Sequence, residues 1–124
     1  MKFRFLGLVA VAGLLASVAA AHHGWEWAEE KQTDLSGTIR EIYIGPPHPT
    51  LKVETAADGV WTVELSNPAQ TVRAGFVEGV TKVGDKVEVL GNRSAKSGQK
   101  LMKAVRLVIA DKTYLLYPER IQKK

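Results

Sequence analysis

The stretch LKVETAADGVWTVEL, residues 51–65, decides the fold class. Apolar and polar side chains alternate on both sides of Asp58-Gly59, and Trp61, Val63 and Leu65 share one face. A period of two places apolar side chains on one side of a β-strand, and Asp-Gly favours a tight turn between two strands. The pattern therefore predicts a β-hairpin whose inner face packs into a core.

The segment before this hairpin predicts a long, bent strand over residues 33–44. The apolar positions change phase near Arg40-Glu41, which indicates a β-bulge or a sharp coil. Gly37 permits a close approach or a bend. The loop that follows, residues 45–49, contains three prolines, which fix φ and remove backbone donors. No strand ladder is expected to run through it.

The segment after the hairpin begins with Asn67-Pro68, which predicts a short helix with Asn67 as its N-cap and Pro68 in its first turn. Gly75 is expected to end it, and Ala69, Val72 and Phe76 are expected to pack on the barrel. The remaining pattern predicts a turn at residues 83–86, a strand at 87–91, a polar loop at 92–99, and strands at 101–109 and 113–117.

This order of elements predicts a mainly β fold. The expected architecture is a small five- to six-stranded OB-like Greek-key barrel, with one short helix between the third and fourth strands. A β-sandwich of similar strand count remains the alternative. The expected domains are a signal peptide (1–21), an N-terminal arm (22–32), the barrel (33–118) and a charged tail (119–124).

The first 21 residues are typical of a secretory signal peptide. Lys2 and Arg4 precede an apolar run over residues 5–20, and Ala19-Ala20-Ala21 supplies small residues for cleavage. A retained membrane anchor is the alternative, but the run is short for a hydrocarbon core of about 30 Å. The protein is therefore expected to be periplasmic or secreted, with membrane contact only during export.

Composition narrows the possible functions. The chain has no cysteine, which excludes disulfides, thiolate metal sites and a lipid-modified cysteine. Cleavage after Ala21 leaves 103 of 124 residues, enough for one domain, with 15 Lys+Arg against 13 Asp+Glu. No block of like charge is long enough to suggest a nucleic-acid tail, and the predicted export also argues against nucleic acid as a partner. Basic residues near the late loop form either a patch or scattered solubilising charge: Arg93, Lys96, Lys100, Lys103 and Arg106.

Short motifs across residues 21–118 carry a family resemblance. They are AHHGW (21–25), GTI (37–39), PH (47–48), LKV (51–53), GVW (59–61), RAGF (73–76), VGD (83–85) and KAV (103–105). On these motifs the chain resembles a family of small exported bacterial proteins of uncharacterised function. Residues 82–91 also resemble a turn and strand common in exported OB-like domains. The resemblance implies a soluble periplasmic OB-like domain and brings no activity with it.

The three histidines are the candidate metal ligands. His22 and His23 lie at the expected mature N-terminus, and His48 lies in the loop between the first two strands. Cleavage after Ala21 makes His22 the first residue. Its amine and imidazole could then chelate one metal, with His23 or His48 as a third nitrogen ligand. This arrangement resembles the histidine brace of copper proteins. Cleavage after Ala20 or Ala19 instead allows a square plane of amine, backbone and imidazole nitrogens. All three sites favour Cu(II) or Ni(II).

Each of these candidate ligands also has an interpretation that involves no metal. A His22-His23 pair after a cleavage site is also typical of a solvated chain end, and a histidine between prolines is also typical of a turn. Trp25 and Trp27 are expected to pack on the barrel and hold the arm, or to shield a ligand face together with Glu26. The neighbouring acids are expected to orient the histidines, to add an oxygen ligand, or to form a solvated face.

The sequence thus supports two functional hypotheses. The first is a non-enzymatic exported protein that binds Cu(II) through His22, His23 and His48. The second is an OB-like accessory module that binds a small ligand or an envelope protein without metal. No motif for a serine, cysteine, zinc-hydrolase or phosphate-binding enzyme is present. A copper-dependent oxidative enzyme is a third, lower-ranked option because it also needs an open coordination position and a substrate surface.

Overall fold

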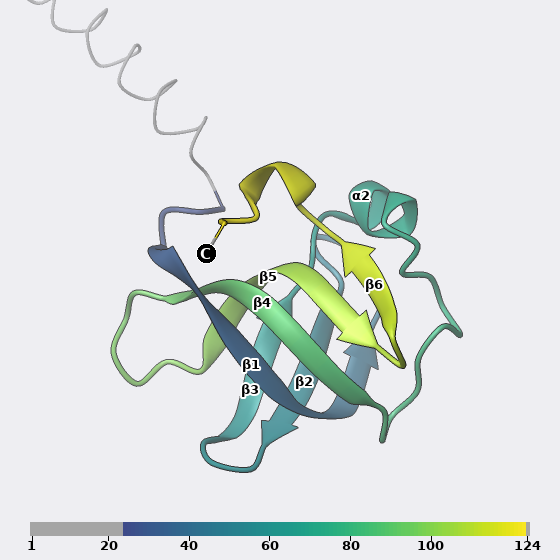
Figure 1. Cartoon of the computed structure of the whole chain (residues 1–124), viewed down its shortest axis with the longest axis horizontal. Coiled ribbons are helices and arrows are strands. Elements are labelled where there is room, and N and C mark those ends of the chain that lie inside the picture. The colour runs from purple at the N-terminus through teal and green to yellow at the C-terminus, as the bar shows by residue number, and fades with distance from the viewer. Residues whose placement is uncertain (1–23, 124) are drawn as a thin grey trace, which may run out of the picture.

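The computed structural model describes residues 24–123, which form six β-strands, one short α-helix and one 3-10 helix (Figure 1). The predicted signal peptide, its cleavage site and the histidines at 22 and 23 lie outside the described residues. In chain order the elements are β1 (Ala28–Tyr43), β2 (Thr50–Thr55), β3 (Gly59–Glu64), α2 (Pro68–Arg73), β4 (Lys86–Ser94), β5 (Leu101–Ile109), β6 (Lys112–Leu115) and η1 (Pro118–Arg120).

All six strands belong to one sheet in the order β3-β2-β1-β4-β5-β6. Neighbours in this order pair antiparallel, and the predicted hairpin of residues 51–65 is confirmed as β2 and β3. An additional parallel pairing joins Thr62–Glu64 of β3 to Leu101–Lys103 of β5. The mainly β prediction is confirmed, and the single sheet differs from the two facing sheets of the sandwich alternative.

β1 carries the predicted irregularity. Its register against β2 shifts between Ile39 and Glu41, so the expected bulge is confirmed. The expected close approach at Gly37 is also present, because a Cβ there would collide with the backbone carbonyl oxygen of Glu54. Glycine at this position therefore lets β1 and β2 pack closely where β1 bends.

Two strands extend beyond their predicted bounds. β1 begins at Ala28 rather than at residue 33, and β4 runs on to Ser94 rather than ending at 91. The added segments are polar, so hydrophobic alternation did not mark them. Backbone pairing and the Asn92 side chain hold them together, since its Nδ2 donates to the Glu29 oxygen at 2.9 Å and to the Glu30 oxygen at 3.2 Å.

The short helix α2 begins as predicted. The side chain of Asn67 accepts a hydrogen bond from the Gln70 backbone N at 2.8 Å, which satisfies a donor in the first helical turn. Pro68 occupies the first turn, where its missing N–H costs nothing. Gly75, with φ of +93°, follows the last turn, in the left-handed conformation that glycine adopts most easily.

The face of α2 that packs inward was predicted incorrectly. Ala69 and Val72 are exposed, and Val72 leaves 57% of its surface in solvent. Thr71 is buried instead, and its hydroxyl donates to the Ser66 carbonyl oxygen at 3.0 Å. Phe76 is buried as predicted. The helix has only six residues, so its inward face is set by the chain on either side of it rather than by a repeating apolar stripe.

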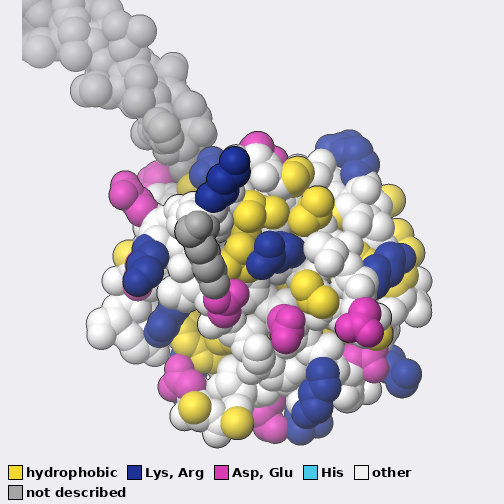
Figure 2. Space-filling model, in the orientation of Figure 1, with side chains coloured by type: hydrophobic (Ala, Val, Ile, Leu, Met, Phe, Trp, Pro, Cys, Tyr) yellow, Lys and Arg dark blue, Asp and Glu magenta, His cyan; other side chains and the backbone are white. Residues whose placement is uncertain are grey.

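The sheet encloses one hydrophobic core. The buried cluster draws on every strand, on Phe76 after α2 and on Leu116 after β6: Ile39, Leu51, Val53, Trp61, Val63, Leu65, Phe76, Val87, Val89, Met102, Ala104, Leu107, Ile109, Tyr114 and Leu116. On the face shown in Figure 2, basic and acidic side chains are interspersed rather than grouped by sign. Within residues 24–123, no helix is long and apolar enough to span a membrane.

Candidate functional site

The most unusual side chain in the structure is a buried lysine. Lys103 in β5 is only 2% exposed. Its neighbours Met102 and Ala104 belong to the hydrophobic core, so the alternation of the strand directs Lys103 to the opposite face of the sheet. Lysine is almost never fully buried unless its charge is paired. The surroundings of Lys103 must therefore compensate a buried ammonium.

Two oxygens bind the ammonium. Lys103 Nζ donates to the Gly24 carbonyl oxygen at 2.8 Å and to Glu64 Oε1 at 3.2 Å, the second contact being an ion pair. The parallel pairing of β3 and β5 places Glu64 opposite Lys103. Gly24 has φ of +97°, and a Cβ there would come within 3.3 Å of Nζ. Glycine at this position thus allows the N-terminal backbone to reach the lysine.

Three aromatic rings surround the same ammonium. Lys103 Nζ lies 4.9 Å from the ring centroid of Trp25, 6.0 Å from that of Trp27 and 5.9 Å from that of Tyr117. A cation over an aromatic face is stabilised by the electron density of the ring. The rings come from the N-terminal segment and from the chain after β6, so Lys103 joins both ends of the described chain to β5.

His48 lies beside this group. Its loop is fixed to the end of β3, because the Leu65 backbone N donates to the Pro49 carbonyl oxygen at 2.9 Å. His48 Nε2 lies 3.6 Å from Glu64 Oε1, the oxygen that also binds Lys103. The other ring nitrogen, Nδ1, is buried and has no hydrogen-bond partner among the described residues. A buried polar atom without a partner is rare and calls for an explanation.

We call these six residues the Lys103 cluster: Trp25, Trp27, His48, Glu64, Lys103 and Tyr117. The C-terminal segment covers one side of it. The Arg120 guanidinium lies 3.9 Å from the ring centroid of Trp25, and the Trp25 and Tyr117 rings meet edge to face at 4.9 Å. The Gln32 backbone N donates to Gln122 Oε1 at 3.1 Å, and the Gln122 backbone N donates to Gln32 Oε1 at 3.0 Å. Residues 118–122 therefore fold back beside the start of β1 (Figure 1).

The pKa of Tyr117 in this cluster is raised above its usual value. Burial raises the pKa of Tyr117, because it disfavours the charged phenolate, and the negative charge of Glu64 raises it further. The nearby Ser66 hydroxyl and the charge of Arg120 lower the pKa and partly offset this rise. The folded protein therefore holds Tyr117 neutral to a higher pH than the unfolded chain does.

This raised pKa predicts a loss of stability in alkali. Below about pH 10, the usual tyrosine value, both states keep the proton and the contribution of Tyr117 is fully present. As the pH rises towards the higher folded-state pKa, the unfolded state loses its proton first, so the free energy of unfolding falls. Urea denaturation at a series of alkaline pH values should show this fall in the wild type and a smaller one in Tyr117→Phe. Equal slopes in the two proteins would contradict the prediction.

Comparison with known protein families identifies the family of the chain. A family model described as "Family of unknown function (DUF6152)" matches residues 10–103, most of the 124-residue chain. The chain belongs to the DUF6152 family. The matched region includes His48, Glu64 and Lys103, and it ends before Tyr117. No curated protein matches the chain.

The structure of this DUF6152 chain locates four of the six residues selected from the sequence. His48, Trp25 and Trp27 come together around Lys103, and both tryptophans are half-buried, as expected of rings that hold the N-terminal segment. Glu26 is exposed and is not part of the cluster. The remaining two, the histidines at 22 and 23, lie outside the described residues, directly before Gly24.

The sequence did not single out Glu64 or Tyr117 as site residues, and it grouped Lys103 with surface charges. Lys103 sits in the strand pattern LMKAVRLVI, where it is the only charge in the first five positions. That isolated charge within an apolar run was the available signal. Its partners come from β3, from the chain after β6 and from residues 24–27. The β3–β5 pairing places Glu64 beside it, and side-chain contacts of Lys103 reach the other two segments.

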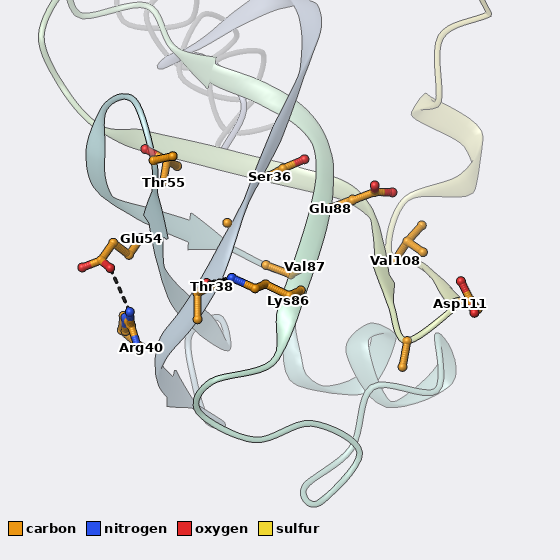
Figure 3. Close-up of a pocket in the computed structure, with 13 residues that line it drawn as sticks. Ser36, Thr38, Arg40, Glu54, Thr55, Lys86, Val87, Glu88, Val108 and Asp111 are labelled. Atoms are coloured by element: carbon orange, nitrogen blue, oxygen red, sulfur yellow. Dashed lines mark hydrogen bonds and ion pairs between the residues drawn. The ribbon is translucent and has the colours of Figure 1, made fainter.

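A separate groove lies along the middle of β1, around residues 36–40. It has a volume of about 650 Å³ and is lined by β1, β2, β4, the end of β5 and the turn after it (Figure 3). Arg40 pairs with Glu54 at 2.9 Å, and Lys86 donates to the Thr38 hydroxyl at 2.8 Å. Within residues 24–123, no group of three or more histidine or acidic side chains is arranged to hold a metal.

Proposed function

We propose that this DUF6152 chain is an exported, periplasmic or secreted, non-enzymatic OB-like barrel protein that binds Cu(II) through His22, His23 and His48. The parallel β3–β5 pairing supports the barrel, because it connects the first strand of the sheet order to the fifth. The position of α2 between β3 and β4 supports the OB-like arrangement. The signal-peptide pattern at residues 1–21 supports export.

One observation carries the copper proposal. The carbonyl of Gly24, the residue directly after His23, binds Lys103, which pairs with Glu64, which in turn contacts His48. Three consecutive contacts thus connect the expected mature N-terminus to the third histidine. In the sequence, the two N-terminal histidines directly precede Gly24.

The chemistry of the donors suits Cu(II). Imidazole nitrogens and a free α-amine are the ligands of tetragonal copper sites, and Cu(II) binds them more tightly than other divalent first-row metals do. The Nδ1 atom of His48 is buried and has no partner among residues 24–123, so no protein group competes for this nitrogen. Glu64 balances the charge of Lys103, so the buried ammonium does not leave a net positive charge against the incoming cation.

The proposal predicts the effect of removing the ligands. The His22→Ala/His23→Ala variant, with or without His48→Ala, should lose at least about 100-fold in Cu(II) affinity. This loss exceeds the 10–100-fold that is typical when a residue that hydrogen-bonds to a metal ligand is replaced. Competition against a chelator of known affinity measures this on the processed protein. Glu78→Ala, an exposed acid outside the Lys103 cluster, is the control and should bind as the wild type does. Unchanged affinity in the histidine variants would contradict the proposal.

The groove of Figure 3 favours the second hypothesis, an accessory module for a small ligand or an envelope protein without metal. Its walls carry both charges and hydroxyl groups, including Arg40, Glu54, Lys86 and Ser36. Apolar surface with a few polar groups is the lining typical of a small-molecule site. Binding there would survive the His22→Ala/His23→Ala change, which separates the two hypotheses.

A further inference from the structure

We propose that the pocket between the β2–β3 turn and the β4–β5 loop binds a small anionic ligand, one that carries a carboxylate or a phosphate group, and that Arg93 binds this group. The pocket has a volume of about 410 Å³, within the range of small-molecule sites. It shares no lining residue with the groove of Figure 3 or with the Lys103 cluster. The inference therefore goes beyond the function proposed above.

Arg93, near the end of β4, is held over an aromatic ring. Its guanidinium carbon lies 4.8 Å from the ring centroid of Trp61 in β3. Trp61 is only 2% exposed, so its indole is a fixed support. A ring contact engages the face of the guanidinium and leaves the N–H groups at its edge able to donate. Within residues 24–123, no carboxylate forms an ion pair with Arg93.

The same indole also orients a second cation. Trp61 Nε1 donates to Asp58 Oδ2 at 3.2 Å, and the other oxygen of this carboxylate lies 3.8 Å from Lys100 Nζ. The backbone of Lys100 is fixed as well, because its carbonyl oxygen accepts from the Thr62 N at 3.0 Å. One buried ring thus positions two basic residues from the β4–β5 loop and its edge.

The charges that line the pocket favour an anion. Lys96 adds a third basic side chain, against two acids, Asp58 and Glu29. Asp58 is already engaged by Trp61 and Lys100, so Glu29 is the lining acid that opposes an incoming anion. Carboxylates and phosphates fit an arginine because two of their oxygens accept parallel N–H bonds from the planar guanidinium.

The test titrates the processed protein with inorganic phosphate and, separately, with succinate, and follows amide and indole N–H groups by heteronuclear NMR. Ionic strength is held constant, because salt screens exposed charges. The Trp61 Nε1–H signal should shift until it saturates, and so should the amide signals of residues 96–99. The indole signals of Trp25 and Trp27 are internal references and should stay in place. The probe that saturates at the lower concentration shows which of the two anions the site prefers.

Replacing the arginine should remove most of the binding. Arg93→Gln should weaken binding of the preferred probe by about 10–100-fold, because it loses the charge-assisted hydrogen bonds. Arg93→Lys keeps the charge without the planar guanidinium and should fall between Arg93→Gln and the wild type. Arg73→Gln is the matched control: it makes the same charge change at an exposed arginine of α2 outside the pocket, whose Nε binds Gln70 at 3.0 Å. Equal losses in Arg93→Gln and Arg73→Gln would overturn the site, because they would show only general attraction between charges.

A second pair of variants keeps the test decisive if Arg93→Gln does not fold. Glu29 and Lys96 are exposed and line the pocket with opposite charges. Glu29→Gln should tighten binding and Lys96→Gln should weaken it, each by roughly 2–5-fold. The proposal is overturned if the Trp61 Nε1–H signal shows no saturable shift with either probe. It is also overturned if binding is unchanged in a folded Arg93→Gln protein or in both Glu29→Gln and Lys96→Gln. None of these outcomes affects the copper proposal, which the histidine variants test separately.

Discussion

Replacing Glu64 with glutamine is expected to lower the free energy of unfolding by about 3 kcal/mol, because it leaves a buried ammonium without its counter-ion. Lys103 is 2% exposed and has no other acidic partner within the Lys103 cluster as described. Glu64 itself is 21% exposed, which places the effect at the lower end of the range for buried pairs. Urea denaturation near neutral pH measures the change.

The chain offers a matched control on the neighbouring strand. Arg40 and Glu54 form an ion pair at 2.9 Å, but their side chains are 49% and 48% exposed. Glu54→Gln should therefore change the free energy of unfolding by less than about 1 kcal/mol. In the Lys103→Met/Glu64→Gln protein no charge remains buried, so part of the loss should be recovered. Equal effects of Glu64→Gln and Glu54→Gln would contradict the assignment of Lys103 as a buried, paired charge.

Replacing Gly91 with alanine should also destabilise the protein strongly. Gly91 lies in β4 where the register against β5 shifts, and an added Cβ would collide with the backbone oxygen of Lys103 and lie 2.8 Å from Met102 Cγ. Because backbone in a paired strand cannot move aside easily, the cost should reach the upper part of the usual range for overpacking, about 1–3 kcal/mol. Denaturant titration measures it.

Ser97→Ala is the control for this substitution. Ser97 is exposed in the loop between β4 and β5, so its loss should change the free energy of unfolding by no more than about 0.5 kcal/mol. If β4 and β5 separate to accept the methyl group, Lys103 moves with them, and the fluorescence of Trp25 and Trp27 should change as well. A Gly91→Ala protein as stable as the wild type would show that the two strands are not as close as described.

The sequence predicted the parts of the fold that depend on local chemistry. The Asp58-Gly59 hairpin, the Asn67 cap and the bulge after Ile39 all follow from a turn dipeptide, a capping side chain or a break in alternation. Strand ends were less predictable. The polar residues 28–32 join β1 through backbone hydrogen bonds, which the pattern of side chains does not reveal.

The candidate site was predictable only in part, because it depends on long-range pairing. His48, Trp25 and Trp27 were selected by residue type and position. Lys103 was interpreted as one of several surface charges, since a lysine in a strand usually points to solvent. Its burial follows from the N-terminal segment and the chain after β6 closing over the outer face of β5, an arrangement that no single segment of sequence encodes.

The central claim is that the processed chain binds copper at its N-terminus beside His48. Native mass spectrometry tests it most directly, on protein exported by its own signal and purified without chelator or tag, because one spectrum gives both the first residue and the bound metal. We predict a chain that begins between Ala20 and His22, carries one copper, and loses it in the His22→Ala/His23→Ala variant. A metal-free chain, or one that retains residues 1–21, would contradict the account.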